Sequence, residues 1–160
     1  MKKVWAFILC VMLVLGLAAC GGDNADSKSV DVDVNQLADD MLAALDPQGE
    51  LTEVSGDVAA NFYELGDFVK EYKIYVSGMY IAEEVAVFRL TDPGKAEDGK
   101  TMVENRIAAL KKSFDGYLPE EFASMNENAL VLSKGDIVCF LVGLNPGRDA
   151  AKEVFDKAVG

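Results

Sequence analysis

The sequence predicts an α+β domain in which a mainly antiparallel sheet, built from two hairpins, is covered by helices. The first hairpin is indicated by apolar and polar residues that alternate over 72–77, and by a Val- and Phe-rich stretch over 84–90. The second is indicated by apolar stretches over 129–133 and 137–142, which flank a Lys-Gly turn. Because strand-strand-helix occurs twice, the helices are expected to pack against one sheet.

Two helices are predicted ahead of the strands. Residues 33–45 carry apolar side chains every three or four positions, which places these side chains on one helical face. They are Val34, Leu37, Ala38, Met41, Leu42 and Leu45. Asp33 is placed to cap this helix, and Asp46-Pro47 ends it. Residues 58–64 are expected to form a short helix that ends at Gly66.

A third helix is predicted to end near residue 114, but its start stays open because Gly99 is costly inside a helix. Its apolar stripe consists of Val103, Ile107, Leu110 and Phe114. Residues 117–128 contain Pro119 and several acids, and they are interpreted as a connector.

The last hairpin and helix are marked more clearly. Residues 137–142 are wholly apolar, as expected of a central strand that is buried on both faces, so Cys139 is predicted to be an inert core position. Asn145-Pro146 is placed to open the final helix, with Asn as the cap. The inward-facing residues of that helix are expected to be Ala151, Val154, Phe155 and Ala158.

The chain begins with the three parts of a secretory signal. Lys2 and Lys3 precede an apolar run over 4–19, and small residues lie directly before Cys20. The run is shorter than the roughly 20 residues that a membrane-spanning helix needs, so cleavage before Cys20 is expected. A cysteine in this context resembles a bacterial lipobox, which implies lipid on Cys20 and attachment to the extracytoplasmic face of the cell membrane.

Three regions follow from this interpretation. Residues 1–19 are a lipoprotein signal peptide, and residues 20–32 are the lipidated cysteine and a flexible tether that is poor in apolar residues. Residues 33–160 form a single globular domain. Because Cys10 leaves with the signal and Cys20 is lipidated, Cys139 remains alone and no internal disulfide is expected.

The composition excludes several classes of function. Removal of Lys2 and Lys3 with the signal leaves 13 basic and 27 acidic residues, a formal charge of −14. Such a chain has no basic stripe for a phosphate backbone, so nucleic acid is not expected as a partner. The chain contains no histidine. This excludes Ser-His-Asp and Cys-His catalysis, and no metal or cofactor is expected.

Residues 94–101 match the phosphate-loop pattern G-x-x-x-x-G-K-[ST] letter for letter. Glu97 and Asp98, however, would place two carboxylates where phosphate anions bind. The preceding strand belongs to a hairpin, and the strand over 137–142 lacks a following aspartate to bind magnesium. The stretch is therefore interpreted as a turn before a helix, and nucleotide is not expected as a partner.

Acidic residues suggest two other sites. Residues 31–35 begin like a calcium loop, but Gln36 and Leu42 stand where glycine and a bidentate glutamate are required. Glu83-Glu84 and Glu120-Glu121 are adjacent acidic pairs, and glycoside hydrolysis uses two carboxylates about 5–10 Å apart. Neighbours in a strand point to opposite faces, so neither pair forms such a site alone.

The candidate binding surface is an apolar loop between the strands of the first hairpin. Met79 and Tyr80 lie in this loop, between Tyr75 on one strand and Glu83 before the next. Exposed apolar residues of this kind mark sites for partners, although such a loop can also fold onto its own core.

Several short stretches occur together in the chain. They are Tyr75-Val76-Ser77-Gly78, Ala82-Glu83-Glu84-Val85-Ala86-Val87-Phe88, the helix from Arg106 through Lys112-Ser113-Phe114 into Tyr117-Leu118-Pro119-Glu120, and Asn128-Ala129-Leu130-Val131. Their order resembles a family of bacterial envelope lipoproteins, domain-of-unknown-function family 4358, over about residues 34–158. The resemblance implies an envelope location and carries over no site residues.

These observations predict a lipid-anchored envelope protein that binds a protein, a wall component or a small ligand and is not an enzyme. Its lipid on Cys20 would make the membrane a partner. The alternative is a small envelope hydrolase that uses carboxylates on cell-wall glycan.

Overall fold

The computed structural model describes residues 28–78 and 80–160. The predicted signal peptide, Cys20 and Met79 lie outside the described residues. Among the described residues, no helix has both the length and the apolar character needed to span a bilayer.

One antiparallel sheet forms the centre of the molecule. Its strands are β1 (Thr52–Val54), β2 (Val69–Val76), β3 (Glu84–Leu90), β4 (Leu130–Lys134) and β5 (Ile137–Val142). They lie in the order β1-β2-β3-β5-β4, and each neighbouring pair is antiparallel. The two predicted hairpins, β2-β3 and β4-β5, therefore meet through β3 and β5 at the middle of the sheet.

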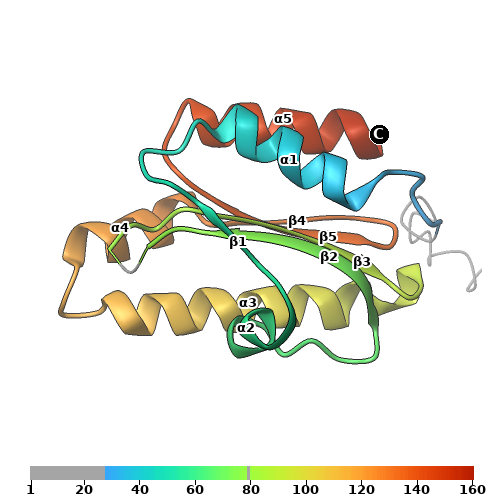
Figure 1. The fold of residues 1–160 in the computed structure, drawn as a ribbon, viewed down its shortest axis with the longest axis horizontal. Coiled ribbons are helices and arrows are strands. Elements are labelled where there is room, and N and C mark those ends of the chain that lie inside the picture. The colour runs from blue at the N-terminus through green and yellow to red at the C-terminus, as the bar shows by residue number, and fades with distance from the viewer. Residues whose placement is uncertain (1–27, 79) are drawn as a thin grey trace, which may run out of the picture.

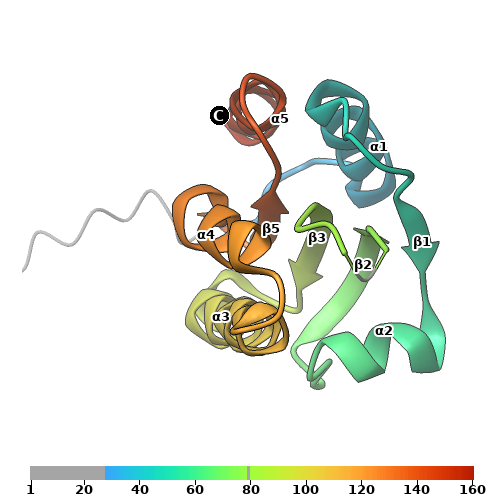
Figure 2. The same ribbon diagram turned by 90° about the vertical axis from the view of Figure 1, so that its left-hand side faces the viewer.

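Helices cover both faces of this sheet, so the predicted α+β class is confirmed. On one face lie α1 (Val34–Leu45) and α5 (Gly147–Val159), and on the other lie α2 (Gly56–Phe62), α3 (Ala96–Phe114) and α4 (Pro119–Asn128). Figures 1 and 2 show the resulting three layers, with α4 beside the end of α3. A 3-10 turn, η2 (Pro93–Lys95), leads into α3.

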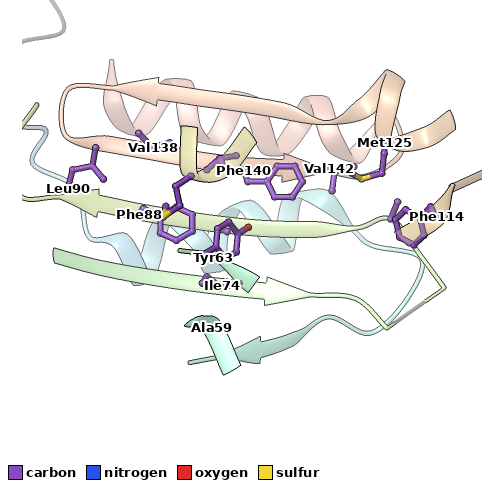
Figure 3. Packing of buried hydrophobic residues seen from close by; sticks show 14 residues of the cluster. Ala59, Tyr63, Ile74, Phe88, Leu90, Phe114, Met125, Val138, Phe140 and Val142 are labelled. Atoms are coloured by element: carbon purple, nitrogen blue, oxygen red, sulfur yellow. The ribbon is translucent and has the colours of Figure 1, made fainter. Parts of the chain in front are cut away.

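Each face of the sheet has its own buried core. The core under α1 and α5 includes Met41, Leu141 and Cys139, and the core under α3 includes Phe88 and Phe140. Cys139 is fully buried, as the sequence predicts, and burial raises the pKa of its thiol. Figure 3 shows side chains of the second core gathered over the strands of the sheet.

The connector predicted over 117–128 is wrong, because Pro119 opens α4 instead of interrupting it. Proline is tolerated at the first helical position, where its missing N–H has no intrahelical partner. Glu120 and Glu121 lie in the first turn, where negative charge is favourable. Phe122 and Met125, three residues apart, pack the helix against the core of the α3 face.

The phosphate-loop pattern does not form a loop. From Ala96 onwards its residues belong to α3, and Lys100 pairs with Glu97 at 2.8 Å. Gly99 is buried, and a Cβ atom at this position would lie 3.0 Å from side-chain atoms of Leu90 and Val138. Glycine therefore serves here to bring the helix close to the sheet.

Two helix starts test the predicted caps. Asp33 caps α1 as expected, because its carboxylate accepts a bond from the Gln36 N–H at 2.9 Å. The last helix begins at Gly147, and its cap residue is Pro146 without a side-chain cap bond, so the predicted Asn145 cap is wrong. Ala158 is exposed and Val159 is buried in its place, since Val159 follows Phe155 by one helical turn.

A polar clamp holds the chain that enters α1. Asp136, buried in the β4-β5 turn, accepts from the Val30 N–H at 2.7 Å and from Arg89 Nη1 at 3.0 Å. Arg89 also donates to the carbonyl oxygens of Val30 and Val32. Residues 30–32, which the sequence assigns to the tether, are thus bonded to the end of the central strand β3.

Candidate functional site

A cavity of about 390 Å³ opens at the end of the sheet opposite the clamp. The β2-β3 loop, the C-terminal half of α3 and the α3-α4 turn surround it. In Figure 1 these segments gather at the end where α4 lies, and the clamped chain enters at the other end. The position of the cavity follows from the β2-β3 hairpin, because the loop that joins these two strands lies at this end of the sheet.

The walls of the cavity are mainly apolar. The apolar side chains that line it include Phe62, Val76, Ile81, Leu110, Phe114, Leu118 and Val142. Most of these come from α2, α3 and two strands, whereas Ile81 lies in the β2-β3 loop and Leu118 in the α3-α4 turn. Several of them also pack against the core of the α3 face. Helices and strands therefore form most of the walls, and the β2-β3 loop lies on one side.

A buried ion pair contributes the main polar groups of the cavity. Glu84, at the start of β3, and Arg106, in the middle of α3, both line it. Arg106 Nη2 donates to Glu84 Oε2 at 2.7 Å, and Nε lies 3.2 Å from both carboxylate oxygens. The side chains are 3% and 10% exposed for Glu84 and Arg106, so the pair is withdrawn from bulk water.

Aromatic rings complete the surroundings of this pair. The Tyr63 hydroxyl donates to Glu84 Oε1, and the guanidinium carbon of Arg106 lies 4.5 Å from the centre of the Phe62 ring. Burial first, and then the Glu84 carboxylate, raise the pKa of Tyr63 well above its ordinary value. Tyr63 in turn packs edge-on against Phe88, with ring centres 4.8 Å apart. Figure 3 shows Tyr63 and Phe88 side by side in the core.

One guanidinium nitrogen of Arg106 takes no part in the ion pair with Glu84. Nη1 makes no hydrogen bond within residues 28–78 and 80–160. Every fully buried side-chain nitrogen or oxygen atom of these residues has a hydrogen-bond partner. Because Nη1 has none, it must be at least partly accessible to solvent. Arg106 also lines the cavity, so its guanidinium group lies at a wall that an occupant would contact.

A smaller hollow of about 210 Å³ lies beside the cavity and shares Ile81, Ala82 and Glu83 with it. Glu120 and Glu121 also line it. Its carboxylates already accept backbone bonds: Glu83 from the Gln48 and Gly49 N–H groups, and Glu121 from the Ala82 N–H at 2.6 Å. Two of the three acids therefore hold the β2-β3 loop in place.

Residues 43–143 match the family described as a domain of unknown function, DUF4358. The chain belongs to this family. The match spans every residue that lines the cavity, from Phe62 to Val142. No curated protein and no solved structure matches the chain. The cavity is thus built entirely within the part of the chain that matches DUF4358, whereas most of α1 and all of α5 lie outside the matched residues.

The DUF4358 domain places the residues of the predicted binding surface on different faces. Tyr80, which is 61% exposed, and Glu83 both line the cavity. Tyr75 lies on the opposite face of the sheet, where its hydroxyl donates to Asp39 of α1. Burial and the Asp39 bond raise the pKa of Tyr75. Met79 falls outside the described residues.

The ion pair is the part of the site that the sequence prediction missed, although a signal was present. Arg106 lies three residues after Val103 and four before Leu110, so it occupies the apolar stripe of α3. A charged residue at such a position needs a partner.

The described residues contain no group of three or more acids and cysteines that could hold a metal ion.

Proposed function

We propose that this DUF4358 protein is anchored by lipid on Cys20 outside the cytoplasmic membrane and binds a ligand in the cavity between the β2-β3 loop and α3. It acts by binding and not by catalysis. The observation that carries the proposal is the cavity itself, whose size falls in the range of small-molecule sites and whose apolar walls surround one ion pair.

The exposed aromatic residues support the same place. Tyr80 and Tyr117 line the cavity and are 61% and 70% exposed. Leu144, 43% exposed, lines the adjoining hollow. Large apolar side chains that gather at one end of a monomer mark binding sites, whereas scattered ones do not.

Two neighbouring alanines of α3 provide a matched test of the binding site. Both are exposed, but Ala109 lines the cavity and Ala108 does not. Ala109→Trp should fill the cavity, and Ala108→Trp should leave it open. A library of small amphipathic molecules and soluble wall fragments is screened for a rise in melting temperature, since a ligand that binds only the folded state stabilises it.

Hits should raise the melting temperature of the parent and of Ala108→Trp but not of Ala109→Trp. A rise in all three proteins would place binding elsewhere, and the absence of any hit would count against the binding function.

The anchor is tested separately by growing cells with an alkyne fatty acid. The parent and Cys10→Ala should carry the label in the membrane fraction, because Cys10 belongs to the predicted signal peptide. Cys20→Ala should carry none. Label that persists in Cys20→Ala would refute lipidation at this cysteine.

A second candidate, a glycan hydrolase, is favoured by one observation: Glu83, Glu120 and Glu121 surround the smaller hollow. Digestion of cell-wall glycan is measured for the parent and for Glu→Gln changes at positions 83, 84, 120 and 121. Loss of activity in one folded variant would favour the enzyme over the binding protein.

A further inference from the structure

We propose that the cavity selects an uncharged ligand, an aromatic or branched aliphatic group joined to a hydrogen-bond acceptor such as an amide carbonyl. The acceptor takes its bond from Arg106 Nη1. This inference rests on the proposed binding function and adds the chemical class of the ligand.

The walls select the apolar part of the ligand. Phe62, Leu110 and Phe114 approach from two helices, and Val76 and Val142 from the sheet. Transfer of an apolar group into such walls is favourable in proportion to the area removed from water. A phenyl ring or a branched aliphatic chain also makes dispersion contacts with the aromatic lining.

The ion pair selects against charge. Three of the contacts between Arg106 and Glu84 are 3.2 Å or shorter, so the guanidinium charge is already matched by a carboxylate. An anionic ligand would approach the Glu84 carboxylate, and a cationic ligand would approach the guanidinium. Either would lose hydration without gaining an uncompensated counter-charge.

A neutral acceptor meets neither penalty. Arg106 Nη1 is a charged donor without a protein partner in the described residues, and its side chain is only 10% exposed. An amide oxygen that accepts from it gains a charge-assisted hydrogen bond in a largely apolar setting. Such a bond contributes about 1.5–3 kcal/mol, which corresponds to an affinity gain of about tenfold or more.

Three probes with the same phenyl body test the charge preference: 3-phenylpropionamide, 3-phenylpropionate and 3-phenylpropylammonium. Their dissociation constants are measured by saturation-transfer NMR at pH 7, with the full chain in lipid nanodiscs. The signal from Ala109→Trp in identical nanodiscs is subtracted, because it contains the probe that enters the lipid. The amide should bind about tenfold more tightly than either charged probe.

A paired variant identifies the donor. Glu84→Gln with Arg106→Met removes both charges together, so no lone charge is left buried. In this variant the amide should lose its advantage of about tenfold, while the phenyl body still binds. If the variant does not fold, the three probes on the parent protein still decide the question.

The outcomes separate the two proposals. Tighter binding of 3-phenylpropionate or 3-phenylpropylammonium would overturn the inference and leave the binding function intact. Equal signals from the parent and Ala109→Trp for every probe would overturn the inference together with binding in the cavity.

Discussion

Replacement of Arg106 by methionine should destabilise the protein far more than a surface change would. Methionine keeps much of the volume of the side chain but removes the partner of Glu84, which is 3% exposed. Breaking a buried ion pair in this way costs about 3–5 kcal/mol, because an uncompensated charge stays in a poorly solvated place. That is a large share of the 5–15 kcal/mol that stabilises an ordinary domain.

The paired variant Glu84→Gln/Arg106→Met should recover most of this loss. The Tyr63 hydroxyl, which donates to Glu84 Oε1, can donate equally to a glutamine oxygen. Replacement of a buried pair by neutral groups is often close to neutral, so the paired variant should lie within about 2 kcal/mol of the parent.

Urea unfolding followed by circular dichroism measures these differences. Fluorescence is a poor choice, because the only tryptophan, Trp5, lies in the predicted signal peptide. Ala108→Trp serves as a control for an exposed change on the same helix. The reasoning fails if Arg106→Met costs less than about 1 kcal/mol, or if the paired variant is no more stable than the single one.

Three further predictions concern other parts of the molecule. Burial raises the pKa of Tyr63 and of Cys139, so the folded state holds both protons while the unfolded chain releases them. The free energy of unfolding should therefore fall above about pH 9, by up to ~1.4 kcal/mol per pH unit for each group. The double variant Tyr63→Phe/Cys139→Ala should show a smaller fall when the free energy is measured by urea unfolding at each pH. An unchanged dependence of the free energy on pH would contradict this prediction. Gly99→Leu should destabilise the protein by about 1–3 kcal/mol through overpacking of α3 against the sheet. Gly99→Ala should be nearly neutral, because the gain in helix propensity of about 1 kcal/mol offsets the crowding of its Cβ atom. Equal melting temperatures for the two variants would argue against the close approach of α3 to the sheet. Asp136→Ala should speed hydrogen exchange at the Val30 amide to the rate of an unprotected residue, and retained protection would show that the clamp does not depend on this carboxylate.

The strands of the two hairpins could be predicted from the sequence, because their residue patterns are typical of strands. The strands over 84–90 and 137–142 were predicted with their observed bounds, since short stretches rich in valine, phenylalanine and other apolar residues suit buried strands. β1 was not predicted. It is a three-residue edge strand whose Thr52 and Glu53 are exposed, so its residues show no alternation of apolar and polar side chains. Only its pairing with β2 identifies it as a strand.

The site was less predictable, for a physical reason. The loop residues Tyr80 and Glu83 could be chosen from local composition, because an apolar loop beside a strand is visible in the sequence. The pairing of Glu84 with Arg106 joins residues that are 22 positions apart, and it depends on how α3 lies across the sheet. The connector predicted around Pro119 was wrong for a local reason. Proline breaks the interior of a helix, but it is tolerated at the first helical position.

The clamp and the cavity lie at opposite ends of the central strand. Arg89 pairs across the sheet with Ile137 beside the clamp, and Glu84 pairs with Val142 beside the cavity. At about 3.4 Å for each residue, the strand separates them by roughly 17 Å. The chain that precedes Val30 therefore joins the body at the end far from the cavity, and a force applied through it would act on Arg89 and Asp136 before it reached the cavity. Under the proposed attachment at Cys20, a longer or shorter segment before Val30 should change how far the body stands from the membrane.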